Sequence, residues 1–263
     1  MLFRSNYAGS SFSELLDLDH PHLKLDFAEL ARKAAQPIQA PHGTTVLAFK
    51  LDDGVLVAGD RLATSGNMVA SRDVEKVFAT DERSLMAIAG AAGPAIEMAR
   101  ILRIELEHYE KIEGEALELE GKANKLSQMI RQNLPAAMQG LVVVPIFAGY
   151  DVRRRTGRLW KYDVTGGRYE ETELECSGSG GIIAKESLKK AWRPGLSRAE
   201  GVRAAVEALM DAADEDRATG GVDVARGIYP IVKFSTADGI EDVPESELAE
   251  VYTAIASERA NRG

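Results

Sequence analysis

The pattern of apolar and polar positions changes character at residue 44. In residues 1–43, only the segment 27–35 (FAELARKAA) has the spacing of an amphipathic helix, and its flanks are polar and contain prolines. Proline and glycine residues cluster just before the change. We therefore expect residues 1–43 to be a flexible, exposed leader and residues 44–263 to form the folded domain.

Strand patterns open the domain. Residues 44–51 (TTVLAFKL) and 55–60 (VLVAGD) are apolar runs separated by the turn sequence Asp-Asp-Gly. This arrangement predicts a β-hairpin. Shorter runs of the same kind at 76–80 and 84–90 predict two further strands.

Two helical patterns follow, at 94–110 and 122–134. In each, apolar residues recur at spacings of three and four and so lie on one face of a helix. Strand patterns then return at 141–151, 157–164 and 169–180.

The clearest helix in the sequence begins at Ser197. Ser197 and Glu200 have the spacing of a capping box, in which each side chain satisfies a free N–H group of the first turn. An apolar stripe continues from there along the helix. A strand pattern at 228–236 and a helical pattern at 245–260 complete the chain.

The element order is strands, two helices, strands, two helices, a strand and a helix. Several strand runs are almost continuously apolar, which indicates burial on both faces. Two stacked sheets covered by helices on each side satisfy that requirement. We therefore expect a layered α/β or α+β architecture.

Composition narrows the functional classes. The chain has 263 residues and a net charge of −9, and its basic residues are scattered rather than gathered in the patch typical of nucleic-acid binding. The longest apolar run, 141–150, is too short to cross a membrane, and the first twenty residues lack the apolar core of a secretory signal. The single cysteine, Cys176, indicates a reducing compartment. These features predict a cytoplasmic protein that binds neither nucleic acid nor membrane.

The junction Gly43–Thr44 has two interpretations. In the first, Thr44 and Thr45 are ordinary β-branched strand residues behind a linker glycine. In the second, the chain is cut before Thr44, which then carries a free α-amino group with a pKa of about 7.7–8.0. Such an amine can serve as the general base that a threonine hydroxyl needs to become a nucleophile, so no histidine is required.

Candidate helpers for this chemistry lie at neighbouring strand ends. Asp60 follows the second strand of the hairpin and Lys76 precedes the next strand, so both could lie beside Thr44. A cation there would lower the hydroxyl pKa and favour the neutral amine. The glycines in residues 87–94 (AIAGAAGP) offer backbone N–H groups for an oxyanion. Taken singly, each of these residues is more typical of a turn or a solvated surface position than of a catalytic site.

Taken together, five segments resemble successive signatures of the proteasome β subunit, in the family's order, over nearly all of residues 44–236. They are GTTVLAFKLDDGVLVAGDRLATSG, RDVEKVF, AIAGAAGPA, CSGSGG and EDRATGGVD. The long leader, the acidic balance and the HGTT junction are most similar to the actinobacterial type. The resemblance implies an α+β fold, a four-layer αββα sandwich of two antiparallel sheets between helix layers. It also implies a threonine-type endopeptidase that removes its own leader.

The resemblance assigns roles to individual residues. The family's nucleophile corresponds to Thr44, and the buried carboxylate and lysine beside it correspond to Asp60 and Lys76. The oxyanion donor corresponds to Gly90. The pair that positions the amine and a catalytic water corresponds to Ser179 and Asp216. Cleavage after Gly43 would expose the nucleophile. Thr219 stands where the family usually has serine, which keeps the hydroxyl.

The resemblance also implies a set of substrate-binding positions, namely Ala63, Thr64, Ala70, Val74, Ile88, Gly90 and Ala92. Those that line the first specificity pocket are Ala63, Val74 and Ile88. All three are apolar, which predicts cleavage after hydrophobic residues. Backbone groups at other positions would bind an extended peptide as an added strand.

The resemblance extends to partners. It implies stacked sevenfold rings of β subunits and α subunits, with a ring-shaped ATPase that feeds unfolded proteins marked by a small ubiquitin-like protein. It implies no cofactor and no metal. His20 and His22 lie in the leader and make only a weak metal site on their own.

Three alternative functions remain. The chain could be an N-terminal nucleophile hydrolase acting on small amides, a subunit of the simpler bacterial two-ring protease, or a non-catalytic ring subunit. A non-catalytic subunit would typically lack Thr44, Asp60 or Lys76, and all three are present. Whether the Thr44 amine or Lys76 is the base also stays open at this level.

Overall fold

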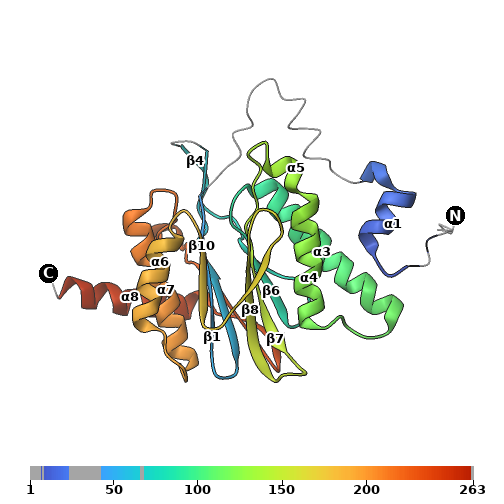
Figure 1. Cartoon of the computed structure of the whole chain (residues 1–263). Helices are drawn as coiled ribbons and strands as arrows, with labels where there is room; N and C mark the ends of the chain where they lie inside the picture. Colours follow the sequence, from blue (N-terminus) through green and yellow to red (C-terminus); the bar gives the residue numbers. More distant parts are fainter. Residues whose placement is uncertain (1–6, 8, 24–42, 66–67, 262–263) are drawn as a thin grey trace.

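The computed structural model describes residues 7, 9–23, 43–65 and 68–261. Two five-stranded antiparallel sheets lie face to face, and helices cover the outer side of each (Figure 1). In spatial order, the first sheet consists of β10 (Leu174–Gly178), β1 (Thr45–Lys50), β2 (Gly54–Gly59), β11 (Ile231–Thr236) and β12 (Gly239–Asp242). The second consists of β5 (Val77–Ala79), β6 (Ser84–Ala87), β7 (Ile146–Asp151), β8 (Thr156–Tyr162) and β9 (Arg168–Glu171).

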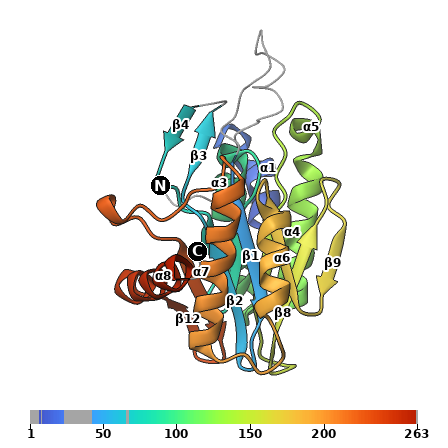
Figure 2. The ribbon, with the colours of Figure 1, turned by 90° about the vertical axis from the view of Figure 1, so that its left-hand side faces the viewer.

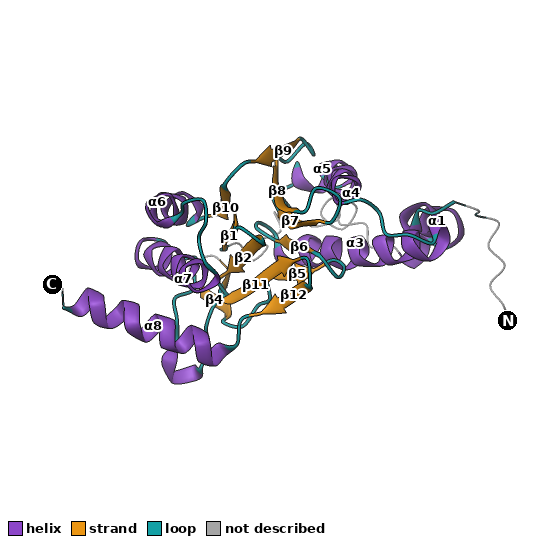
Figure 3. Ribbon diagram, turned by 90° about the horizontal axis from the view of Figure 1, so that it is seen from below, coloured by secondary structure: helices purple, strands orange, loops and turns teal. Residues whose placement is uncertain are grey.

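Helices form the two outer layers (Figure 3). On the side of the first sheet lie α6 (Gly181–Ala191), α7 (Arg198–Glu215) and α8 (Glu245–Ala260). On the side of the second sheet lie α3 (Ala92–Glu113), α4 (Leu119–Gln132) and the short α5 (Leu134–Ala137). The predicted α+β fold, a four-layer αββα sandwich, is therefore confirmed.

Apolar side chains fill each boundary between the layers. In β1 and β2, Leu47, Phe49 and Leu56 belong to the core beneath α6 and α7. Val46 and Val57 belong to the core between the two sheets. Successive residues of a strand point to opposite faces, so a strand covered on both sides is apolar throughout. This explains the continuous apolar runs in the sequence.

Two predicted strands begin later than their apolar runs. β7 begins at Ile146 rather than at residue 141, and β11 begins at Ile231 rather than at residue 228. Each begins directly after a proline, Pro145 or Pro230. Proline has no N–H for the ladder, so each strand begins after it. Before Pro145, the pairing is reduced to an isolated bridge between Val143 and Gly90.

The single strand predicted at 169–180 is wrong, because this segment forms two strands in different sheets. β9 pairs with β8 in the second sheet, and β10 pairs with β1 in the first. The chain crosses from one sheet to the other at residues 172–173. Periodicity follows one chain segment at a time and carries no information about which neighbour that segment pairs with.

A small two-stranded sheet that the sequence pattern did not predict projects beside the sandwich (Figure 2). It consists of β3 (Ala63–Ser65) and β4 (Met68–Ser71). β4 is exposed along its first three residues. The chain from β2 to β5 passes through this hairpin, so the residues on either side of it lie at the ends of two different sheets.

The described part of the leader is ordered, which corrects the expectation of a flexible, exposed segment. α1 (Phe12–Asp19) packs against α3 and buries Leu16. The N–H and hydroxyl of Ser13 donate to Glu105 Oε2 at 2.6 and 3.1 Å. A 3-10 turn, Pro21–Leu23, follows α1. The helix predicted at 27–35 lies outside the described residues.

The capping box at the start of α7 is confirmed. The Ser197 N–H donates to Glu200 Oε2 at 2.9 Å, and the Glu200 N–H donates to Ser197 Oγ at 3.4 Å. The sequence pattern predicts two helices before the last strand, and these are α6 and α7.

Within the described residues, no helix combines the length and the apolar character that a bilayer crossing requires.

Candidate active site

Thr44 lies directly before β1, at the end of a central strand of the first sheet. Because β1 is hydrogen-bonded to β10 on one side and to β2 on the other, the ends of all three strands meet there. Thr44 is 7% exposed and Thr45 is fully buried. The strand end therefore holds both threonines in a fixed position among polar groups from distant parts of the chain.

Asp60 and Lys76 form a buried ion pair next to this strand end. Lys76 Nζ lies 2.7 Å from Asp60 Oδ1, and the two side chains are 2% and 0% exposed. Asp60 follows β2 in the first sheet, and Lys76 precedes β5 in the second. The stacking of the sheets brings the two residues together across 16 positions of sequence.

Lys76 Nζ has two further acceptors, the carbonyl oxygens of Leu62 at 2.5 Å and Gly43 at 2.9 Å. Three acceptors match the three N–H bonds of an ammonium group. Burial nevertheless lowers the pKa of Lys76 below its usual value of 10.5, and this effect outweighs the opposing attraction of Asp60. The lysine is therefore both a donor to the Gly43 carbonyl and easier to deprotonate than a surface lysine.

Four N–H groups hold the Asp60 carboxylate. Oδ1 accepts from the Thr45 N–H and from Lys76, each at 2.7 Å. Oδ2 accepts from the N–H groups of Leu62 at 2.9 Å and Gly220 at 2.7 Å. With both oxygens engaged, the carboxylate cannot rotate, and it fixes the lysine relative to β1.

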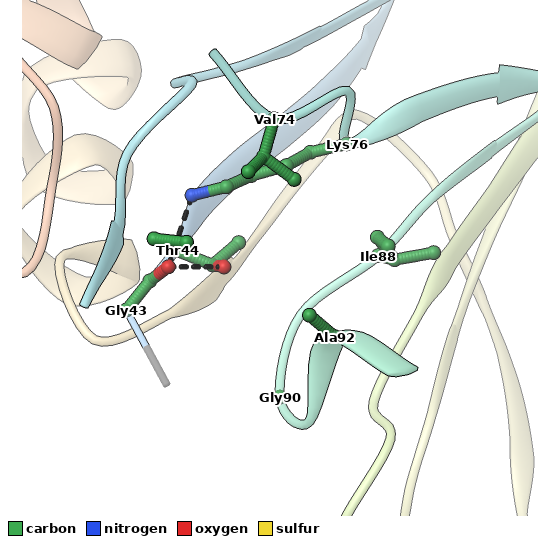
Figure 4. A pocket seen from close by; sticks show the side chains of 8 residues that line it. Gly43, Thr44, Val74, Lys76, Ile88, Gly90 and Ala92 are labelled. Carbon is green, nitrogen blue, oxygen red and sulfur yellow. Dashed lines mark hydrogen bonds between the residues drawn. The ribbon is translucent and has the colours of Figure 1, made fainter. Parts of the chain in front are cut away.

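Gly43 has no room for a side chain. Its φ is +145°, and an added Cβ would lie 2.7 Å from Thr64 Oγ1 and 2.8 Å from the Ala218 carbonyl oxygen. Its own carbonyl oxygen accepts hydrogen bonds from Thr44 Oγ1 at 2.5 Å and from Lys76 Nζ (Figure 4). The hydroxyl of Thr44 and the amine of Lys76 thus converge on the carbonyl of the bond between residues 43 and 44.

Ser179 and Asp216 lie on the other side of Thr44. The Ser179 N–H donates to the Thr44 carbonyl oxygen at 2.9 Å, and Ser179 Oγ lies 2.5 Å from Asp216 Oδ2. Thr219 Oγ1 donates to the same carboxylate oxygen at 2.6 Å. Burial acts to raise the pKa of Asp216, but these two hydroxyl donors, the Ala218 N–H and the charge of Lys76 together outweigh it, and the pKa lies below its usual range.

Gly90 occupies the tight connection between β6 and α3. Its φ is +106°, and a Cβ there would lie 2.2 Å from the Val142 carbonyl oxygen. Glycine alone adopts this conformation without strain. The turn carries the backbone of residue 90 to the pocket that Thr44 also lines.

The pocket beside Thr44 brings together most of the residues predicted to bind substrate. Figure 4 shows the side chains of Val74, Ile88 and Ala92 around it. Its lining consists of Gly43, Thr44, Ala63, Val74, Lys76, Ile88, Gly90 and Ala92. The pocket volume is about 10 Å³, which is room for about one water molecule.

Two predicted substrate-binding residues lie outside this lining. Thr64 is in β3, where its side chain is next to Gly43 rather than in the pocket. Ala70 is on the exposed strand β4. Both belong to the β3–β4 hairpin, whose position could not be read from the sequence pattern.

Sequence reasoning missed the part that Thr45 plays in this network. Its side chain is completely buried, and Thr45 Oγ1 lies 2.6 Å from Thr219 Oγ1. The Gly180 N–H donates to Thr45 Oγ1 at 3.1 Å. The signal in the sequence was the second threonine of the pair, a polar residue at a strand position that is otherwise apolar.

Cys176 and His108 are two further candidates for chemistry, and the Nε2 atom of His108 is buried without a hydrogen-bond partner in the described part of the chain. Burial raises the pKa of the Cys176 thiol to about 12, so it is an inert core residue. His108 lies on α3 with its ring 6.0 Å from that of Phe12 in α1. The described residues contain no cluster of three or more side chains able to ligate a metal ion.

Comparisons with known proteins agree with the geometry. The family model described as "Proteasome subunit" matches residues 40–226. "Proteasome subunit beta" of Acidimicrobium ferrooxidans is 52% identical over 249 residues, which cover 90% of this chain and 91% of that protein. The chain belongs to the proteasome subunit family, as a β subunit of the threonine-type endopeptidase.

Proposed function

We propose that Thr44 is the nucleophile of a precursor that cleaves itself between Gly43 and Thr44 and then hydrolyses unfolded polypeptides. On this proposal residues 1–43 are a propeptide and residues 44–263 are the mature subunit. One observation carries the proposal. The carbonyl oxygen of Gly43 accepts hydrogen bonds from both the Thr44 hydroxyl and the Lys76 amine.

Self-cleavage starts with attack of Thr44 Oγ1 on the Gly43 carbonyl carbon. In the precursor the Thr44 nitrogen is an amide and cannot accept a proton, so the base must be another group. Lys76 is suited to this step because burial lowers its pKa. After taking the hydroxyl proton, its ammonium donates to the carbonyl oxygen as that atom becomes negatively charged.

The bond between the Gly43 carbon and the Thr44 nitrogen then breaks. The nitrogen takes the proton from Lys76, and the acyl group remains on the Thr44 oxygen as an ester. Water hydrolyses the ester and releases Gly43 as a carboxylate and Thr44 as a free amino terminus. The same sequence of steps, with a substrate carbonyl in place of Gly43, hydrolyses a peptide through an acyl-enzyme.

On this proposal, the Gly90 N–H donates to the substrate oxyanion in the mature subunit. Ser179 and Asp216 hold the freed amine and a catalytic water. The Thr44 amine becomes a second group able to act as the base, because its pKa is close to working pH. Asp60 keeps Lys76 in place through both steps.

The lining of the pocket supports a preference for hydrophobic residues before the cut. Ala63, Val74, Ile88 and Ala92 contribute apolar side chains, and the Lys76 amine in the lining is already hydrogen-bonded. A charged substrate side chain would lose its hydration there without gaining a partner. The small volume of the pocket requires the lining to move apart as a substrate side chain enters.

Membership of the family implies assembly with other β subunits and with α subunits. We propose the finer details from the sequence resemblance alone. These are sevenfold rings, a ring-shaped ATPase that feeds unfolded chains through the α ring, and substrates that carry a ubiquitin-like tag. The lone cysteine supports a cytoplasmic location.

Intact-mass measurement tests the proposed function. The chain is co-expressed with α subunits, and the assembled particles are compared for the wild type and Thr44→Ala. We expect the wild-type subunit to span residues 44–263 and the variant to retain residues 1–43. Active wild-type particles that contain the full-length chain would contradict the proposal.

A further inference from the structure

Thr45 connects the two polar groups that flank Thr44. Its N–H donates to Asp60 Oδ1 at 2.7 Å, on the side of Lys76. Its hydroxyl lies 2.6 Å from Thr219 Oγ1, which donates to Asp216. Thr45 is also covalently bonded to Thr44. One buried residue therefore contacts both halves of the site.

The hydrogen bonds on the Thr219 side have a single consistent direction. A hydroxyl has one proton, and Thr219 donates its proton to Asp216 Oδ2. Thr219 must then accept from Thr45, and Thr45 Oγ1 in turn accepts from the Gly180 N–H. Gly180 thus donates to Thr45, Thr45 donates to Thr219, and Thr219 donates to the Asp216 carboxylate.

Gly180 makes this contact possible. A Cβ at position 180 would lie 2.5 Å from Thr45 Oγ1 and 2.6 Å from Thr219 Oγ1. Real Cβ atoms do not approach other atoms so closely, so a side chain here would push the two hydroxyls apart. The backbone at the start of α6 is therefore shaped around the contact between the two threonines.

The chain of hydrogen bonds ends inside the site and not in the core. Asp216 Oδ2 also contacts the hydroxyl of Ser179. The Ser179 N–H is bonded to the Thr44 carbonyl oxygen. Thr45 thus connects β1 to the Asp216 carboxylate, which contacts Ser179 beside Thr44. A buried valine of similar shape would satisfy the packing of the strand but would not make this connection.

We propose that Thr45 is a positioning residue for the reaction of Thr44. Its hydroxyl, acting through Thr219, holds Asp216 at the distance from Thr44 that the reaction needs, while its N–H holds Asp60. The inference rests on the proposed role of Thr44 as the nucleophile. Thr45 itself does not touch the reacting atoms.

The test uses full-length chains assembled with α subunits and a hydrophobic fluorogenic peptide. Thr45→Val keeps the branched shape and removes the hydroxyl. We expect kcat to fall about tenfold or more with little change in KM, since the substrate pocket is untouched. The acid limb of the pH profile should move to higher pH, because Thr219, no longer held by Thr45, donates less firmly to Asp216, and a carboxylate with a weaker donor has a higher pKa.

Two further variants separate positioning from stability. Thr45→Ser restores the hydroxyl and should recover most of the activity. Thr80→Val removes another fully buried hydroxyl, which is hydrogen-bonded to Ser84. Thr80 directly follows β5, whereas Lys76 directly precedes this strand. Thr80→Val should lower the melting temperature without changing kcat or the acid limb.

Wild-type kcat and pH profile in Thr45→Val would overturn the inference, as would an equal loss of kcat in Thr80→Val. If Thr45→Val does not assemble, Thr219→Val interrupts the same connection without altering β1, and wild-type turnover in that variant would also overturn it. Thr44→Ala is assayed in parallel. Activity in Thr44→Ala would refute the proposed nucleophile, whereas an inactive Thr44→Ala beside an unaffected Thr45→Val would refute only the role of Thr45.

Discussion

At the scale of single residues, the candidate site depends on groups that few other side chains could replace. Lys76 combines burial, a carboxylate partner and a pKa lowered by desolvation. Gly43 combines a positive φ with the absence of space for a Cβ. The property of Lys76 bears on the proposed proton transfer, and that of Gly43 bears on the position of the bond that we propose is cut.

Lys76→Arg should stop self-cleavage. A guanidinium keeps the positive charge beside Asp60 but does not give up a proton at accessible pH. We expect the leader to remain attached, with cleavage slowed at least about a hundredfold, the usual scale for loss of a general base. Wild-type cleavage should become faster as pH rises toward the lowered pKa of Lys76. Intact mass over time measures both.

Lys122→Arg is the matched control for this variant. Lys122 is also a buried lysine paired with an aspartate, Asp81 at 2.8 Å. It lies on α4 rather than beside the Gly43 carbonyl. Its replacement should leave cleavage unchanged, and cleavage at the wild-type rate in Lys76→Arg would exclude Lys76 as the base.

Gly43→Ala should block cleavage for a steric reason. The added methyl group would meet Thr64 and Ala218 at less than 3 Å, so the carbonyl must move away from the Thr44 hydroxyl. Gly114→Ala is the control, because Gly114 also has a positive φ, +76°, but open space around its Cβ. We expect Gly114→Ala to cost about 1 kcal/mol of stability and to cleave normally. Equal cleavage in both variants, measured by intact mass, would show that the contacts around Gly43 are not limiting.

At the scale of elements, α1 is held on α3 by a buried carboxylate. Glu105 is 3% exposed, accepts two hydrogen bonds from Ser13 and pairs with Lys125 of α4. Burial acts to raise its pKa, but the bonds from Lys125 and from serines of the leader outweigh it and leave the pKa below 4.5. The carboxylate therefore stabilises the docked leader in its charged form.

Glu105→Gln should weaken the docking of α1 on α3, because it removes the buried charge that pairs with Lys125, whose other acceptor among the described residues is the Ser11 hydroxyl. Limited proteolysis of the Thr44→Ala precursor should cut within α1 faster than in the parent. For the parent, the docking is complete above the unfolded pKa of about 4.3 and is lost as pH falls through the lower, folded pKa. Glu107→Gln, an exposed change on the same helix, should have no effect. Unchanged protection in Glu105→Gln would show that apolar contacts alone hold the leader.

At the scale of the whole molecule, the sandwich assembles a pocket that no single sheet contains. Ala63 follows the first sheet in the chain, Ile88 follows β6 of the second sheet, and Ala92 begins α3. A pocket of about 10 Å³ is too small for a substrate side chain, so we expect these elements to move apart when a substrate binds. The proposed specificity would then depend on the assembled layers.

Peptides with leucine before the scissile bond should be cleaved in preference to matched peptides with glutamate or arginine there. We expect at least a tenfold difference in kcat/KM, equivalent to about 1.4 kcal/mol, because a charge in the apolar pocket has no partner. The measurement uses assembled wild-type particles, with Thr44→Ala particles as the blank. Equal rates for the charged peptides would contradict the assignment of the pocket.

Prediction from sequence was successful where the signal is local. The hairpin of β1 and β2, the capping box at Ser197 and the layered fold all follow from periodicity and turn residues. It failed where pairing partners decide the structure, as in the division of 169–180 into β9 and β10. The docking of α1 was missed because its main contact, from Ser13 to Glu105, spans 92 residues.

The sequence by itself determined most of the succession of elements, the apolar character of both strand faces and the change of pattern at residues 43–44, since each depends on residues close together in the chain. Only the tertiary structure decided that Asp60, Lys76 and Asp216 surround that junction. It also decided that Thr45 meets Thr219 across 174 residues. The physical reason is that sheet stacking sets these distances, and stacking depends on how whole faces pack and not on the spacing of residues along the chain.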